Sequence, residues 1–121
     1  MKRAIIILGH GSRHAGTKDA IAKLAAEVRK SASDQIIEYA FLQYLQPTLR
    51  EALALCIGQH ADTITIVPFF LHPGAHVMED VPAQVEQVKR QHPGVAVNVT
   101  DFVGSHPLMA AIVLDLVKGK A

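Results

Sequence analysis

The chain has 121 residues, a usual size for one domain, and half of them are hydrophobic while 19% are charged, which excludes an intrinsically disordered chain. Twelve Lys and Arg against eleven Asp and Glu give a net charge of +1, and the basic residues are scattered, so we expect no nucleic-acid partner. The apolar run at residues 4–8 is too short for a signal peptide or a membrane span, and the single cysteine, Cys56, excludes an intrachain disulfide, so we expect one cytoplasmic domain over residues 1–121.

Four short runs rich in β-branched residues alternate with longer stretches of helical period, a pattern typical of βαβ units and a parallel sheet. The predicted strands cover residues 3–8, 35–41, 63–69 and 95–101. The first run is apolar at consecutive positions, as expected of a central strand with helices on both faces.

The stretches between and after these strands carry apolar residues three and four positions apart, which predicts four helices. The second helix is expected over residues 47–59 with Pro47 in its first turn. Asp80 is the predicted N-cap of the third helix, with Pro82 in its opening turn, and Ser105 is the predicted cap of the fourth. The residues expected to face the core are Ala20, Ile21, Leu24, Ala25 and Val28 in the first helix, Leu49, Leu53 and Cys56 in the second, Val81, Val85 and Val88 in the third, and Leu108, Ile112 and Leu116 in the fourth.

Right-handed crossovers and helices on both faces favour an α/β fold with an open, doubly wound, parallel four-stranded sheet in the order 2-1-3-4. Ligands of such sheets bind beyond the carboxyl ends of the strands where the winding reverses, here between the first and third strands. The loops after these two strands hold four of the seven histidines, namely His10, His14, His72 and His76. Because histidine is the commonest metal ligand, this clustering predicts a metal site at that edge.

The first of these loops combines backbone freedom with polar groups. Gly9 and Gly11 bracket His10, so the backbone turns sharply and lets a ligand approach. Ser12, Arg13 and the N–H groups that lead into the first helix form an expected seat for an anion.

A phosphate-binding loop is an alternative interpretation, because residues 11–16 fit the G-x-x-x-x-G spacing. However, Thr17 and Lys18 follow in the reverse of the required order, and no Asp ends the third strand to hold magnesium. Nucleotide binding would test this alternative.

The second loop, residues 68–82, follows a buried strand and presents Gly74, His76 and the acidic pair Glu79 and Asp80. Together with Gly-His-Gly-Ser-Arg at residues 9–13, it closely resembles the small sirohydrochlorin chelatase family. The resemblance extends to Phe41-Leu42 followed by Pro47, and to Gly104, His106 and Pro107.

The resemblance implies that His10 and His76 deliver a divalent metal ion to a bound sirohydrochlorin-type tetrapyrrole, without ATP or any cofactor beyond that ion. Neutral imidazoles suit Co²⁺, Fe²⁺ or Ni²⁺ as ligands of intermediate strength, and Co²⁺ is the expected ion. Two pyrrole protons must leave as the metal enters, so His10 or His76 is the expected base, with Glu79 as an orienter or relay and Asp80 as a helix cap. Gly11, Ser12 and Arg13 are expected to bind the carboxylates of the tetrapyrrole.

Three positions depart from the family pattern. Gln43, which we assign to the substrate site, stands where the family usually has Glu, so a charge that attracts metal or accepts a proton is missing. His14 replaces an acidic or polar residue, and His72 replaces an apolar one, which leaves open whether either is an accessory ligand. His106 is expected to shape a helix start.

Longer members of the family look like two such units in tandem, so the resemblance implies a homodimer for this chain. A metal carrier that uses the same histidines without catalysis is the other open interpretation. Acceleration of metal insertion over the spontaneous rate separates the enzyme from the carrier.

Overall fold

The computed structural model describes residues 1–14, 16–72 and 74–120, and for residues 75–78 it describes the backbone alone. The elements, in chain order, are β1 (Arg3–Gly9), α1 (Gly16–Ser31), β2 (Ile36–Phe41), α2 (Leu49–Gly58), β3 (Thr63–Pro68), α3 (Ala75–Gln91), β4 (Ala96–Val99), the short 3₁₀ helix η1 (Val103–Ser105) and α4 (Met109–Lys118). The four strands form one parallel sheet in the order β2-β1-β3-β4, which confirms the predicted topology.

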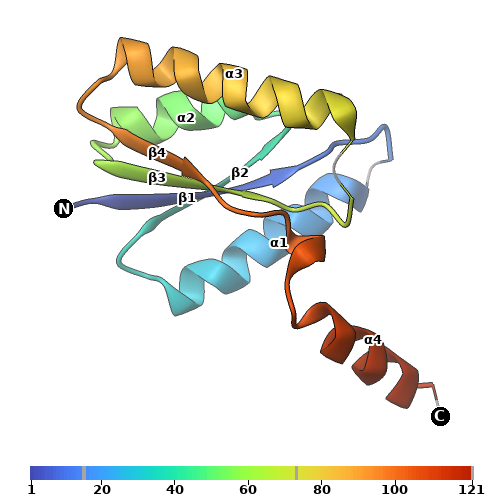
Figure 1. The fold of residues 1–121 in the computed structure, drawn as a ribbon. Helices are drawn as coiled ribbons and strands as arrows, with labels where there is room; N and C mark the ends of the chain where they lie inside the picture. Colours follow the sequence, from blue (N-terminus) through green and yellow to red (C-terminus); the bar gives the residue numbers. More distant parts are fainter. Residues whose placement is uncertain (15, 73, 121) are drawn as a thin grey trace.

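Helices cover the sheet on both faces, as Figure 1 shows: α1 lies on one side, and α2 and α3 lie on the other. The central strand β1 pairs with β2 and β3 in register, so that Ile6 lies beside Glu38 on one side and Ile66 on the other. The carboxyl ends of β1, β2 and β3 therefore meet at one edge of the sheet, and their following loops are neighbours.

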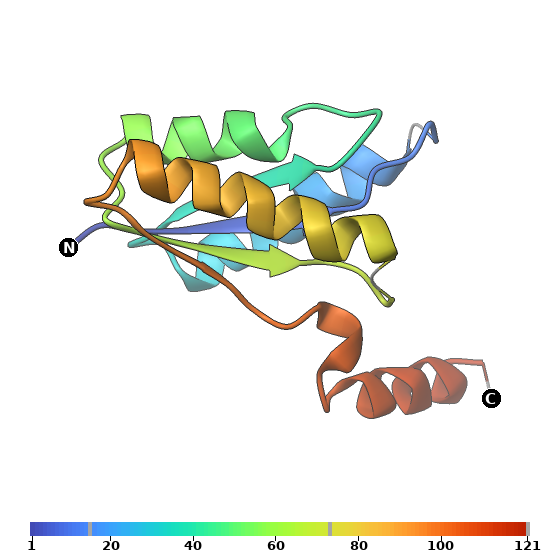
Figure 2. The same cartoon turned by 45° about the horizontal axis from the view of Figure 1, so that its top comes forward.

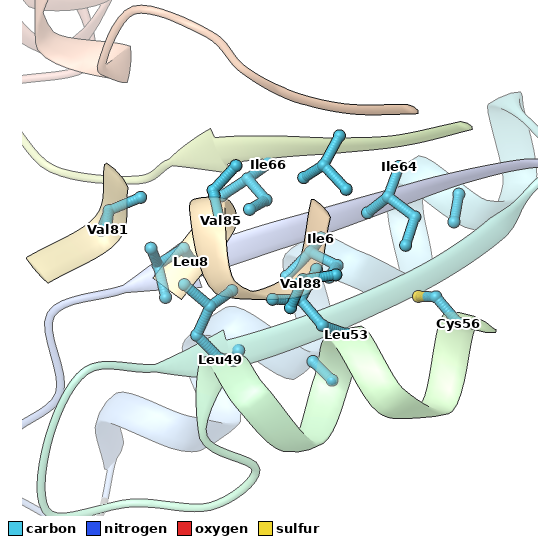
Figure 3. Packing of buried hydrophobic residues seen from close by; sticks show 14 of the residues in the cluster. Ile6, Leu8, Leu49, Leu53, Cys56, Ile64, Ile66, Val81, Val85 and Val88 are labelled. Atoms are coloured by element: carbon cyan, nitrogen blue, oxygen red, sulfur yellow. The ribbon is translucent and has the colours of Figure 1, made fainter. Parts of the chain in front are cut away.

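The larger core lies between the sheet and the pair α2 and α3. Figure 3 shows side chains of both helices gathered against Ile6 and Leu8 of β1 and Ile66 of β3. The predicted inward residues of the two helices are all buried: Leu49, Leu53, Cys56, Val81, Val85 and Val88. The helical period of the sequence thus identifies the buried faces of α2 and α3.

The smaller core lies between α1 and the strands β1 and β2. Ile21 and Ala25 are buried, and Leu24 and Val28 pack against them. Ala20, also predicted to face the core, is exposed. It lies about 100° around the helix from Ile21, at the flank of the apolar stripe.

The prediction that Pro47 lies in the first turn of α2 is wrong, because the helix begins at Leu49. Thr48 is the N-cap, and its hydroxyl accepts a hydrogen bond from the Glu51 N–H at 3.2 Å. The Glu51 carboxylate accepts the Thr48 N–H in return at 2.9 Å. This reciprocal capping box satisfies two N–H groups at the helix start and sets it two residues later than predicted.

The predicted start of α3 at Asp80 is also wrong. The helix begins at Ala75 with Gly74 as its N-cap, so Asp80 and Pro82 lie inside it. Glu79 and Asp80 are both exposed. The consequence for the site is that residue 76 belongs to the first turn of a helix, where a loop was expected.

The last helix differs most from the prediction. Ser105 ends η1 instead of capping α4, whose N-cap is Leu108. Leu108, Ile112 and Leu116 are exposed, because α4 leaves the body of the molecule instead of packing on the sheet (Figure 2). Within the described ranges, every helix lacks either the length or the hydropathy needed to cross a membrane.

Cys56 is buried in the larger core, as predicted for a structural thiol. Burial, together with the negative charge of Glu38, raises the pKa of Cys56 to about 11. The thiol is therefore protonated at neutral pH, and a protonated buried thiol is not a metal ligand.

Candidate functional site

His10 lies where three loops meet at the carboxyl edge of the sheet. It directly follows β1, and its ring contacts the ring of Phe70, from the loop after β3, edge to face with centroids 5.8 Å apart. Its Nδ1 atom lies 3.1 Å from the Nε2 atom of Gln43, from the loop after β2. His10 stays exposed, so it is held from two sides and remains accessible to a ligand.

The loops after β1 and β2 touch through their backbones. Leu42 donates its N–H to the Gly9 carbonyl at 3.1 Å. Gly11 has φ of 92°, and a Cβ atom there would overlap the carbonyl oxygen of Gln43. Only glycine allows both the backbone conformation and this close approach, which places Gln43 beside His10.

We expect Gly11→Ala to lower the free energy of unfolding by about 1–3 kcal/mol, because the substitution adds a strained φ and a steric clash. Denaturant unfolding followed by circular dichroism measures this loss. Gly58→Ala is the matched control: nothing lies within 4 Å of a Cβ there, and the residue ends α2. Equal stability of Gly11→Ala and the wild type would contradict the close approach.

Arg13 stacks on Tyr44, with its guanidinium carbon 4.8 Å from the ring centroid. Tyr44 has φ of 64°, and both residues are exposed. Stacking restricts the guanidinium and leaves its edge free to bind a carboxylate through two hydrogen bonds. No sequence signal marks Tyr44, because its position over Arg13 depends on the conformation of the loop after β2.

The rest of the first loop is bonded within itself. Ser12 Oγ lies 2.6 Å from Thr17 Oγ1 and accepts the His14 N–H at 3.1 Å. The Gly16 N–H donates to His14 Nδ1 at 3.1 Å. Two groups that were expected to bind an anion, the Ser12 hydroxyl and the Gly16 N–H, thus form hydrogen bonds within the loop. The Nδ1 atom of His14 accepts one of these bonds at the start of α1.

Of the two histidines predicted to hold metal, the structure describes the side chain of His10 but not that of His76. The His76 side chain lies outside the described residues, and only its backbone position in the first turn of α3 is known. Whether its imidazole meets that of His10 stays a prediction. Among the described side chains, no three His, Cys, Asp or Glu groups lie close enough together to hold a metal ion.

The remaining candidates lie at the periphery. His72 is exposed, and Glu79 is exposed on α3. His106 Nδ1 accepts the Leu108 N–H at 3.1 Å, which agrees with a role at a helix start. A groove of about 520 Å³ lies between α3 and the segment 97–102, and Phe70, which contacts His10, is one of the residues that line it.

The contact between Gln43 and His10 determines which ring nitrogen is free. With the amide nitrogen facing the ring, Nδ1 accepts and Nε2 carries the proton. With the amide turned by 180°, Gln43 Oε1 accepts the Nδ1 proton, and Nε2 presents a lone pair. The second arrangement resembles that of metal-ligating histidines, whose other ring nitrogen donates to a carbonyl or carboxylate.

Comparisons with known proteins identify the family of this chain. The profile of the CbiX family matches residues 4–120. The sirohydrochlorin cobaltochelatase of Methanococcoides burtonii is 31% identical over 94% of this chain and 93% of its own length. The chloroplastic sirohydrochlorin ferrochelatase of Arabidopsis thaliana is 28% identical over 94% of this chain, which spans only 51% of that relative.

A solved structure of a sirohydrochlorin chelatase has a similar fold. The sirohydrochlorin chelatase SirB from Bacillus subtilis subspecies spizizenii, in complex with cobalt, superposes with a TM-score of 0.87 and 26% identity. The match covers 98% of this chain and 51% of that one. The chain therefore belongs to the CbiX family of sirohydrochlorin chelatases.

Proposed function

We propose that this protein inserts a divalent metal ion into sirohydrochlorin in tetrapyrrole biosynthesis, with Co²⁺ as the preferred ion and Fe²⁺ or Ni²⁺ as possible substrates. The observation that carries the proposal is the position of His10, exposed at the switch point of the sheet and held by Gln43 and Phe70. The named relatives include both a cobalt chelatase and an iron chelatase, so the preference for Co²⁺ is proposed here and is tested by the assay below.

In this proposal the metal ion is a substrate, and His10 and His76 are its protein ligands. Insertion replaces water ligands of the ion with four pyrrole nitrogens, and two pyrrole protons leave. Two imidazoles hold the ion more weakly than a closed set of four ligands, so the macrocycle competes successfully for it. Glu79 is proposed to relay the protons, since it is exposed on α3 three residues after His76.

Recognition of the macrocycle is assigned to the loops around His10. Sirohydrochlorin carries several carboxylates, and the guanidinium of Arg13, oriented by Tyr44, is suited to bind one of them. Gly11, Ser12 and Gln43 complete the proposed substrate site. We further propose that the reaction requires neither ATP nor another cofactor.

We also propose that the active form is a homodimer in the cytoplasm. The site of one chain is formed by exposed side chains at the edge of a small sheet, which offers little surface to enclose a large planar macrocycle. Relatives about twice as long have a second stretch of similar length in the same polypeptide. A second copy would supply that surface here.

The experiment is to mix the protein with sirohydrochlorin and Co²⁺ under anaerobic conditions and to follow the absorption spectrum. A rate above the spontaneous background supports the enzyme. Stoichiometric Co²⁺ binding without acceleration would show a metal carrier instead. Repeating the assay with Fe²⁺ and Ni²⁺ ranks the metals by kcat/KM.

Substitution of Gln43 tests its contact with His10. We expect Gln43→Leu to weaken Co²⁺ binding by about 10–100-fold, because the His10 ring loses the group that fixes its tautomer and orientation. Gln43→Glu should bind Co²⁺ more tightly than the wild type, since a carboxylate accepts the Nδ1 proton and adds negative charge. Isothermal titration with Co²⁺ measures both.

Gln91→Leu is the matched control for these variants, because Gln91 is exposed at the far end of α3. If Gln43→Leu bound Co²⁺ as tightly as Gln91→Leu, Gln43 would have no part in orienting the ligand.

A further inference from the structure

The segment that follows β4 packs against the loop that carries Phe70. The Thr100 N–H donates to the Ile66 carbonyl at 3.0 Å, and the Gly104 N–H donates to the Phe70 carbonyl at 2.9 Å. These two bonds join positions that lie four residues apart on each segment, so the two segments run side by side. The chain after β4 thus continues the parallel alignment of β4 with β3 beyond the end of the sheet.

Gly104 allows the closest approach between these two segments. A Cβ atom there would overlap the carbonyl oxygen of Leu71 and would lie 2.7 Å from the carbonyl carbon and the Cα atom of the same residue. All three are backbone atoms, which cannot rotate away as the end of a flexible side chain can. Any other residue at position 104 therefore has to push the backbone at Leu71 aside, and with it the adjacent Phe70.

The short helix η1, which contains Gly104, is itself held in place. Ser105 Oγ donates to the Phe102 carbonyl at 2.7 Å, and the His106 N–H donates to the Val103 carbonyl at 3.0 Å. Phe102, the N-cap of η1, packs against the larger core. The core therefore fixes η1, and η1 in turn supports the backbone of the loop after β3.

The side chain of Phe70 extends this support to His10. Phe70 is 6% exposed and belongs to the larger core, and its ring meets the His10 ring edge to face. The Phe69 N–H donates to the Leu8 carbonyl at 2.7 Å, so the start of the loop is also bonded to β1, two residues before His10. Because aromatic pairs prefer a defined geometry, the position of Phe70 restricts how the exposed His10 ring can turn.

We propose that Gly104 is a positioning residue for His10, acting through the backbone of the loop after β3 and the ring of Phe70. The inference rests on the function proposed above, in which His10 binds the metal ion. It also pairs Gly104 with Gly11, since each glycine permits a close backbone approach beside His10. Gly11 brings Gln43 to one side of the ring, and Gly104 holds Phe70 against it.

The first test follows the His10 ring in the metal-free protein by NMR of labelled imidazoles. Gly104→Ala is expected to shift the His10 ring resonances, because the ring of Phe70 moves relative to them. The resonances of His92, at the opposite end of the sheet, should stay unchanged in the same spectrum. Gly94→Ala is the matched control, because no atom of the described residues lies within 4 Å of a Cβ there. His10 resonances that match the wild type in Gly104→Ala would overturn the proposal.

The second test is the dissociation constant for Co²⁺, measured by isothermal titration. Phe70→Leu is expected to weaken binding by about 3–10-fold, the loss of one aromatic pair, and Gly104→Ala by a similar factor because it displaces the same ring. Since both act through one contact, the double variant should bind Co²⁺ about as tightly as each single variant. Losses that multiply, or a Gly104→Ala protein that binds Co²⁺ like Gly94→Ala, would exclude the route through Phe70.

Cys56→Ala separates positioning from a general loss of stability, because it truncates the same core near the far end of α2. It should lower the denaturant midpoint and leave the dissociation constant for Co²⁺ unchanged. A Cys56→Ala protein that loses as much Co²⁺ affinity as Gly104→Ala would show that the affinity follows stability, and would exclude positioning.

Ser105→Ala takes the place of Gly104→Ala if the latter does not fold. It removes the hydrogen bond to the Phe102 carbonyl and adds no atom, so it loosens η1 without a clash. We expect it to weaken Co²⁺ binding by about 2–3-fold, within the range for one lost hydrogen bond. An unchanged dissociation constant in Ser105→Ala would overturn the proposal.

His10→Ala separates a failure of this inference from a failure of the proposed function. Co²⁺ affinity that is lost in His10→Ala and kept in Gly104→Ala would leave the metal site in place and remove Gly104 from its support. Co²⁺ affinity that is kept in His10→Ala would overturn the metal site itself, and the positioning role with it.

Discussion

The substitution His10→Ala is expected to lower kcat/KM for Co²⁺ insertion into sirohydrochlorin by at least about 100-fold, the lower range for loss of a positioned acid–base group. The variant removes a proposed metal ligand and the side chain that contacts both Gln43 and Phe70. Stability should change little, since His10 is exposed and no residue of the two core clusters is altered.

The measurement is the initial rate of insertion over a range of Co²⁺ and sirohydrochlorin concentrations, with denaturant unfolding as the check on stability. His92→Ala is the matched control, because His92 is exposed at the C-terminal end of α3, at the opposite end of the sheet. A His10→Ala enzyme as fast as His92→Ala would remove His10 from the mechanism.

The substitution His76→Ala is expected to have an effect of the same order, about 100-fold on kcat/KM, if two imidazoles share the ion. Residue 76 lies in the first turn of α3, directly after the loop that follows β3, so it stands at the sheet edge where β1 presents His10. The loss should appear in Co²⁺ affinity as well as in insertion.

The double variant His10→Ala, His76→Ala distinguishes shared from separate roles. Two ligands of one ion act as a unit, so the double variant should be little slower than either single variant. Losses that multiply would show that the two histidines act at separate steps or sites. His92→Ala again serves as the control, since His92 is the C-cap of the helix that holds His76.

The buried faces of α2 and α3 were predictable from sequence, because the 3.6-residue period of a helix is a local pattern. Val81, Val85 and Val88 illustrate this, since all three are buried although the predicted start of their helix was wrong. Helix boundaries were less predictable, because several residues typical of a helix start can lie within a few positions of one another. Asp80 and Pro82 are typical of a helix start, yet the helix begins five residues before Asp80.

The residues around His10 were predictable only in part. The order of the strands brings the loops after β1, β2 and β3 to one edge, so a site there follows from topology alone. The side-chain contacts within this site do not follow from topology, because they depend on the conformations of the loops. Gly11 and Tyr44, for example, both have a positive φ. Those conformations bring Gln43 to His10 and Tyr44 to Arg13.

The sequence by itself determined the sheet order, the buried faces of α2 and α3, and the two loops that carry the clustered histidines. The buried faces follow from the spacing of hydrophobic residues, which is a local pattern. The sheet order follows from the right-handedness of βαβ crossovers, which is a general rule of parallel sheets. Only the tertiary structure decided that Phe70 and Gln43 hold His10 and that α4 leaves the sheet. These features arise from contacts between distant segments, such as the hydrogen bond from Gly104 to Phe70, and no local pattern encodes them.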